Sequence, residues 1–175
     1  FDSENPVMNL LDLNNKPQKK NLGKYTEWEA LELSFEDFTL LTAVYATGPI
    51  GFTIMVFFDK ALGKVTNKWI KIGLRSSAKV AKNLIDSDTE MYLGKTEYCL
   101  TNRFKEGKAF CKANSKGKSG DIDLEVELTN LSDPSVVSIP FGDNLPLYSQ
   151  KNIFAVKGYV SINGKKYEAN EKSMA

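Results

Sequence analysis

The stretch Asp121-Ile122-Asp123-Leu124-Glu125-Val126-Glu127-Leu128-Thr129-Asn130 alternates strictly between polar and apolar residues. A period of two places the four apolar side chains on one face of an extended strand and the acids on the other. This pattern is typical of an antiparallel strand with one face on a core and one face in water. We expect the acidic face to be solvated, because a catalytic acid and base need unequal environments.

Runs of β-rich residues continue on both sides of this stretch. The predicted strands cover residues 25–33, 38–46, 50–58, 64–74, 89–93, 97–104, 108–114, 121–130, 136–141, 153–162 and 165–168. Between the last two, Asn163-Gly164 predicts a type I′ hairpin, which needs positive φ at both positions. Short strands joined by hairpins, without crossover helices, predict an all-β antiparallel barrel or sandwich.

Four further segments complete the predicted organisation. Residues 1–23 are predicted to form an extended N-terminal arm that docks through its leucines, and residues 24–175 a single β domain that belongs to a longer chain. The segment Ile50–Phe58 is almost wholly apolar, which suits a strand covered on both faces. Residues 75–88 carry apolar side chains at helical spacing, and a short helix and a loop both remain open.

The composition excludes several classes of function. The 175 residues suffice for one domain and include no histidine, which removes Ser-His-Asp and Cys-His catalysis and histidine-ligated metal or haem. We expect neither a metal nor a cofactor. With 23 basic and 22 acidic residues, the chain lacks the basic field that nucleic acid binding favours. No window approaches the ~20 apolar residues of a transmembrane helix.

The two cysteines, Cys99 and Cys111, flank a predicted hairpin turn at residues 105–107. A three-residue turn places them on the same face at diagonal positions, ~7–8 Å apart, which is too far for a comfortable disulfide. We therefore expect free thiols in a reducing compartment. The polar first residues show no signal peptide, so the sequence predicts an intracellular, cytoplasmic protein.

Several runs resemble an uncharacterised protein family. They are Ile139-Pro140-Phe141-Gly142, Leu147–Lys151, Val156-Lys157-Gly158, Ile162–Glu168 and Lys172–Ala175, together with Gly48–Asp59 after Trp28-Glu29. Over roughly residues 28–175 the chain resembles the family called domain of unknown function 2804, which is similar to the lipocalin-like carotenoid hydratases. The resemblance implies a lipocalin-like fold and the N-terminal one of two such halves.

Four residues are candidates for ligand binding. At the mouth of a barrel, Tyr148, Gln150 and Lys151 would orient the polar head of a ligand, whereas the alternative is a simple turn between two strands. Trp69 is the fourth candidate. Bases of a single-stranded nucleic acid could stack on Trp69 while nearby lysines contact the phosphates, but the near-zero net charge of the chain argues against that partner.

Three functions remain open at this stage. The first is a non-catalytic, lipocalin-like domain that binds an apolar or amphipathic small molecule. The second is a structural or interaction subunit of a larger assembly, which docks through its arm and sheet edge onto another protein or onto the missing second half. The third, a hydratase-like enzyme, has least support, because there is no histidine and no acid in a convincing pocket.

Overall fold

The computed structural model describes residues 26–82, 84–140 and 146–175, so the predicted arm at residues 1–23 lies outside the described residues. The strands are β1 (Thr26–Ser34), β2 (Phe38–Thr47), β3 (Ile50–Asp59), β4 (Lys64–Leu74), β5 (Ala78–Lys79), β6 (Asp88–Leu93), β7 (Thr96–Arg103), β8 (Lys108–Gly117), β9 (Gly120–Asn130), β10 (Ser135–Pro140), β11 (Pro146–Lys151), β12 (Phe154–Ile162) and β13 (Lys165–Glu168). Two short 3₁₀ turns, η1 (Arg75–Ser77) and η2 (Phe104–Glu106), interrupt them.

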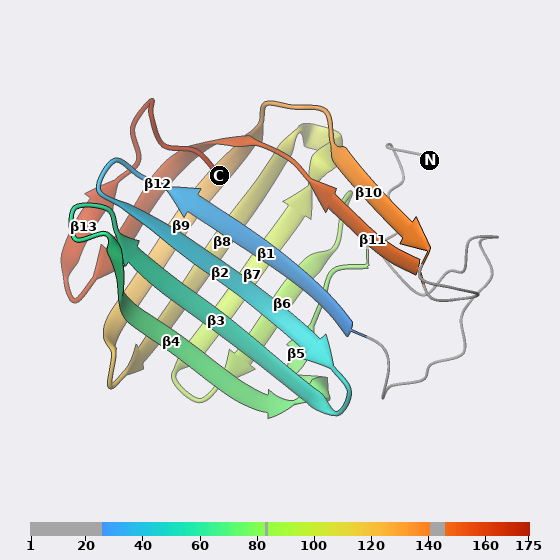
Figure 1. Cartoon of the computed structure of the whole chain (residues 1–175), viewed down its shortest axis with the longest axis horizontal. Helices are drawn as coiled ribbons and strands as arrows, with labels where there is room; N and C mark the ends of the chain where they lie inside the picture. The colour runs from blue at the N-terminus through green and yellow to red at the C-terminus, as the bar shows by residue number, and fades with distance from the viewer. Residues whose placement is uncertain (1–25, 83, 141–145) are drawn as a thin grey trace.

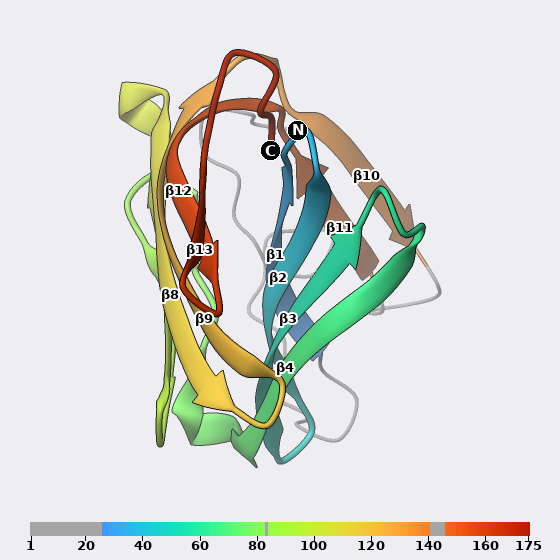
Figure 2. The same ribbon diagram turned by 90° about the vertical axis from the view of Figure 1, so that its left-hand side faces the viewer.

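Eleven of the strands form two antiparallel sheets that pack face to face, as Figure 2 shows edge-on, and β10 and β11 form a separate two-stranded sheet. A four-stranded sheet has the order β1-β2-β3-β4, and a seven-stranded sheet has the order β13-β12-β9-β8-β7-β6-β5. In Figure 1 the strands of the two layers cross at a steep angle, and the β10–β11 hairpin lies on the β1 side of the four-stranded sheet. The all-β antiparallel prediction is confirmed; among the described residues the strands do not close into a barrel.

The core lies between the sheets because each strand turns one set of alternate side chains inward. The largest fully buried side chains include Leu33, Phe38, Leu40, Val44, Met55, Met91, Tyr98, Leu124, Leu128 and Val160. The stretch 121–130 behaves as its pattern predicts, with its four apolar side chains buried and Asp121, Asp123 and Glu125 exposed. Along the described chain, every buried side-chain nitrogen or oxygen has a hydrogen-bond partner.

The last residues of the chain connect the two sheets. Ser34 at the end of β1 exchanges backbone hydrogen bonds with Met174, at 2.8 and 3.0 Å. Phe154 at the start of β12 does the same with Ala175. One edge of each sheet is thereby joined to the other through residues 174–175.

The structure confirms the predicted Asn163-Gly164 hairpin and decides the open question of segment 75–88. Asn163 and Gly164 have φ values of 51° and 82°, as the predicted type I′ hairpin requires. The segment 75–88 contains the 3₁₀ turn η1, the two-residue strand β5 and an extended connection, so its described residues form no α-helix.

The two cysteines do not share a face of the hairpin. Four residues, 104–107, connect β7 to β8, one more than the predicted three. The extra residue reverses the alternation on one strand. Cys99 is therefore opposite Lys112 and half-buried on the outside, whereas Cys111 is opposite Leu100 and buried in the core. Both thiols are free, as predicted.

Candidate functional site

The sequence-predicted binding residues are not brought together as a barrel mouth. Tyr148, Gln150 and Lys151 lie on strand β11, which pairs with β10, and not in a turn between strands. The Gln150 side chain donates to Asn152 Oδ1 at 3.1 Å, and Lys151 is exposed. A strand was not predicted here because the run Tyr-Ser-Gln-Lys lacks apolar alternation.

Trp69 belongs to the core and not to a surface where bases could stack on it. Its side chain is 4% exposed and points inward from β4. The indole Nε1 donates to the carbonyl of Gly120 at 2.9 Å, which ties the edge of the four-stranded sheet to the β8–β9 turn. Trp69 therefore stabilises the contact between the sheets.

The outward face of β1–β4, onto which Figure 1 looks, is apolar. On the edge strand β4, Ile70, Ile72 and Leu74 are 52%, 66% and 73% exposed. The residues that the register places on this outer apolar face are Thr26, Trp28, Ala30, Glu32 and Ser34 on β1, Thr39, Leu41, Ala43, Tyr45 and Thr47 on β2, Ile50, Phe52, Ile54, Val56 and Phe58 on β3, and Val65, Lys68, Ile70, Ile72 and Leu74 on β4. The hydroxyl residues lie at the ends of β1 and β2. Monomeric proteins seldom expose large contiguous apolar patches.

The prediction for Ile50–Phe58 is therefore half met. Its inward residues Met55 and Phe57 are buried in the core, but on the outward side Ile50 remains 43% exposed. The composition of β3 suits a strand with two covered faces, and the described part of the chain covers only one.

The outer surface of the seven-stranded sheet shows what a solvated face looks like in the same molecule. Charged side chains of β8 and β9 pair across it, with Lys112 3.5 Å from Glu125 and Lys116 4.0 Å from Asp121. By contrast, among the described residues of β1–β4, Glu32 and Lys68 are the charged side chains that the register places on the outer apolar face, and the Lys60 ammonium reaches its end, 3.0 Å from Ser34 Oγ. The acidic stripe predicted to be solvated is thus confirmed, and the outer apolar face departs from that pattern.

The outer apolar face is built in rows that run across the strands. One row stacks Trp28 on Tyr45, with ring centroids 6.0 Å apart, and Tyr45 on Phe52, at 4.7 Å. The register continues this row from Phe52 to Ile72 on β4. Stacked rings hold one another in fixed rotamers, so the row forms a rigid ridge.

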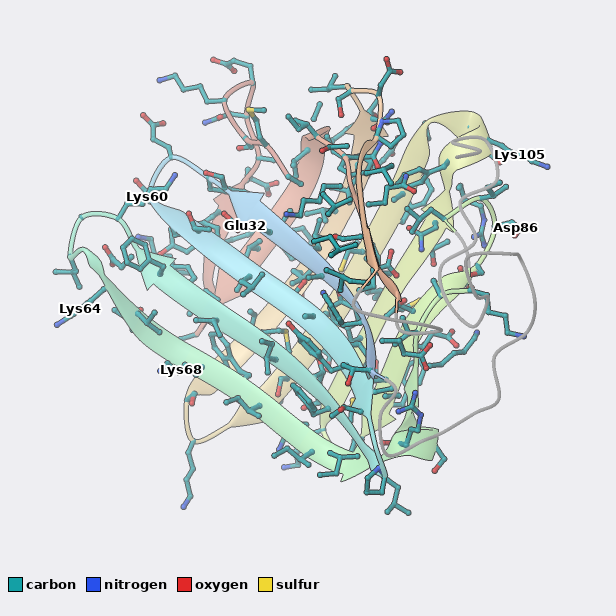
Figure 3. The ribbon with its side chains drawn as sticks, turned by 45° about the vertical axis from the view of Figure 1, so that its right-hand side comes forward. Glu32, Lys60, Lys64, Lys68, Asp86 and Lys105 are labelled. Carbon is teal, nitrogen blue, oxygen red and sulfur yellow. The ribbon has the colours of Figure 1, made fainter. Side chains whose placement is uncertain are left out.

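The two neighbouring rows differ from this one in side-chain size and in charge. In the next row, Ala30 and Ala43 are followed by Ile54 and Ile70, so the surface is low over β1–β2 and high over β3–β4. The row beyond consists of Glu32, Leu41, Val56 and Lys68, with the two charges at opposite edges of the sheet (Figure 3).

A second candidate site lies between the sheets, where β1 buries the carboxyl of Glu29. Asn102 on β7 donates from Nδ2 to Glu29 Oε1 at 3.0 Å, and Thr89 on β6 donates from Oγ1 to Oε2. The backbone N–H of Ala81 donates to Thr89 Oγ1 at 2.8 Å, so the hydroxyl proton is free to point at Glu29. We call Glu29, Thr89 and Asn102 the buried acid cluster.

Burial raises the pKa of Glu29 from 4.5 to about 7, against the hydrogen bonds from Thr89 and Asn102, which lower it. A nearby charge on Asp88 raises it further. A carboxyl with such a pKa can hold or release a proton near neutral pH. Both oxygens are already engaged inside the molecule, so the cluster links the two sheets more directly than it presents a reactive group.

Sequence reasoning missed Glu29, although the signal was present. Leu31 and Leu33 are apolar and alternate with polar residues on the first strand, and the same period of two places Glu29 on their face. The general rule that acids stay on the surface outweighed the strand period at this position.

An open hollow of about 470 Å³ lies on the outer surface of the seven-stranded sheet. Its lining includes Cys99, Phe110, Glu127, Lys157 and Gly158. Gly158 has a φ of 120°, and a Cβ there would lie 2.2 Å from the Glu125 carbonyl oxygen, so glycine permits the close approach of β12 to β9 beside the hollow. Among the described residues no group of three or more His, Cys, Asp or Glu side chains could hold a metal.

No family model, no curated protein and no solved structure matches this chain. The resemblance to the family called domain of unknown function 2804 therefore stays a prediction. None of the described helical segments is long and apolar enough to cross a membrane.

Proposed function

We propose that this chain is an interaction domain that docks onto another protein through its outer apolar face. The observation that carries the proposal is the exposure of Ile70, Ile72 and Leu74 on a face whose rows, among the described residues, carry charges at Glu32 and Lys68 on the two edge strands. The partner of such a face is an apolar protein surface that matches its relief, with one basic and one acidic group at its margins, opposite Glu32 and Lys68.

The physical reason is the cost of leaving this face in water. Burial of apolar surface contributes about 25 cal/mol per Å², and monomers rarely expose contiguous apolar patches larger than a few hundred Å². The aromatic ridge Trp28–Tyr45–Phe52 adds the rigid rings that dominate binding energy at protein interfaces. The charge-paired surface of the other sheet offers nothing comparable.

Binding of an amphipathic small molecule is the second candidate. The hollow at Gly158, which Phe110 and Lys157 help to line, is the observation in its favour. It is open, and its lysine–glutamate pairs already satisfy one another, as between Lys108 and Glu127 at 2.6 Å. We therefore rank it below docking through the outer apolar face.

A photo-crosslinking amino acid placed at single positions in the cell tests the docking proposal. Position 72 on the outer apolar face is compared with position 92, where Tyr92 is 57% exposed on the other sheet. We expect one discrete protein adduct from position 72, none from position 92, and loss of the adduct when Ile70→Lys is added. No adduct from position 72, or equal adducts from both positions, would refute the proposal.

Ile70→Lys suits this test because Ile70 is exposed and its substitution leaves the core intact. A melting curve of the purified variant checks this directly. The matched control is Tyr92→Lys, which adds the same charge to the other sheet and is expected to leave the adduct unchanged.

A further inference from the structure

We infer that the occupant of the outer apolar face is a second copy of this chain, related by a twofold axis that runs along the strands between β2 and β3. The inference rests on the proposed function, because it names the partner of that same face. Such an axis places β1 of one copy over β4 of the other and β2 over β3. Each row of residues then faces the same row of the second copy, read in the opposite direction.

Charge complementarity is the first argument for this arrangement. Glu32 and Lys68 belong to one row, at its two ends. Reversal of the row sets Glu32 of each copy opposite Lys68 of the other, so the dimer contains two such pairs. Among the described residues, the rows between Trp28 and Glu32 contain no other charged side chain, so no like charges meet within them; the Lys60 ammonium lies beyond these rows, 3.0 Å from Ser34 Oγ at the end of β1. Alignment of opposite charges fixes the register of an interface and disfavours wrong partners.

Shape complementarity is the second argument. In the neighbouring row the twofold axis sets Ala30 opposite Ile70 and Ala43 opposite Ile54. The low side of the surface on one copy therefore receives the high side of the other. Interdigitation of large and small side chains is what stacked sheets need to pack about 10 Å apart.

Area is the third argument. Four strands spaced ~4.8 Å apart and about nine residues long present roughly 600 Å² per copy. Two copies together bury roughly 1,200 Å², the lower end of the range for specific interfaces. The area predicts a reversible dimer whose population depends on concentration, and not a permanent one.

The test is sedimentation equilibrium of the purified chain with a charge-swap cycle. We expect the unchanged chain to dimerise, and Glu32→Lys or Lys68→Glu alone to weaken the dimer roughly 10- to 30-fold, because each places like charges in both pairs. The double variant restores all the pairs and is expected to regain the original dissociation constant. A mixture of the two single variants is expected to form a heterodimer, because one carries a fully basic face and the other a fully acidic one.

The possible failures are distinguishable. A chain that stays monomeric at 0.5 mM overturns the second copy as partner, as does a dimer that ignores the charge swaps and yields to Tyr92→Lys. In either case an adduct from position 72 of a mass other than two copies leaves the proposed function standing. A monomeric chain without any such adduct overturns both. Thermal melts of each variant show that a lost dimer is not a lost fold.

Discussion

Replacement of Glu29 by glutamine is predicted to abolish a loss of stability that the unchanged protein suffers as the pH rises. Glu29 has a pKa of about 7 in the folded protein and an ordinary value of 4.5 when exposed. Between these two values the folded state holds a proton that the unfolded state has released. Stability therefore falls as the pH rises through this window, and it is flat with respect to Glu29 above it.

The magnitude follows from the two pKa values. Each pKa unit corresponds to about 1.4 kcal/mol, so a rise from 4.5 to about 7 predicts a loss of about 3 kcal/mol between pH 4.5 and pH 7. Glutamine is neutral at every pH and has nearly the shape of the protonated acid. The Glu29→Gln variant should therefore match the unchanged protein near pH 4.5 and exceed its stability by up to about 3 kcal/mol at pH 8.5.

Urea unfolding monitored by tryptophan fluorescence, at intervals from pH 4.5 to 8.5, measures this difference. The control is Glu97→Gln, an exposed acid on β7 whose carboxylate accepts from Asn114 at 3.1 Å, and it should track the unchanged protein throughout. In Thr89→Val, Glu29 loses a hydrogen bond that lowers its pKa, so the fall in stability should extend above pH 7. Parallel curves for Glu29→Gln and the unchanged protein across the whole range would refute the reasoning.

Two further predictions concern single side chains. Burial raises the pKa of Cys111 to about 12, so its thiol is protonated at pH 8. A thiol reagent at pH 8 should therefore modify only Cys99 of the two cysteines in the folded protein, and both in urea. A Cys99→Ser variant that still reacts rapidly when folded would contradict this. Trp69→Phe removes the indole N–H that donates to the Gly120 carbonyl, so the free energy of unfolding measured in urea should fall by about 1 kcal/mol; an unchanged midpoint would show that the bond contributes nothing.

The strands were predictable because most of them obey one period. Stretch 121–130 and the Asn163-Gly164 hairpin need no tertiary information, since the alternation and the turn residues determine them locally. Strand β11 was missed because its residues alternate weakly, and among the described strands it pairs with β10 alone. How the strands divide between two sheets depends on long-range packing, which no local pattern encodes.

The candidate sites were harder to predict for a specific reason. The interpretation of Tyr148, Gln150 and Lys151 relied on residue type, whereas the placement of a side chain depends on its face. Parity counted from Leu33 would have placed Trp28 outside and Glu29 inside. The same counting fails for the cysteines, because one additional residue in the turn reverses every face that follows it.

The beginning of β1 links the two candidate sites, because it inverts the usual arrangement of a strand. Trp28 faces outward and Glu29 faces the core, where its burial needs hydrogen bonds from two other strands. A shift by one residue would bury the tryptophan and expose the acid, but it would also expel Leu31 and Leu33 from the core. An outward tryptophan that continues into a stacked aromatic ridge is favourable if a partner covers that ridge. The same register thus buries an acid in the core and places a tryptophan on the outer apolar face. Local patterns that conflict with the fold in this way are expected at functional sites.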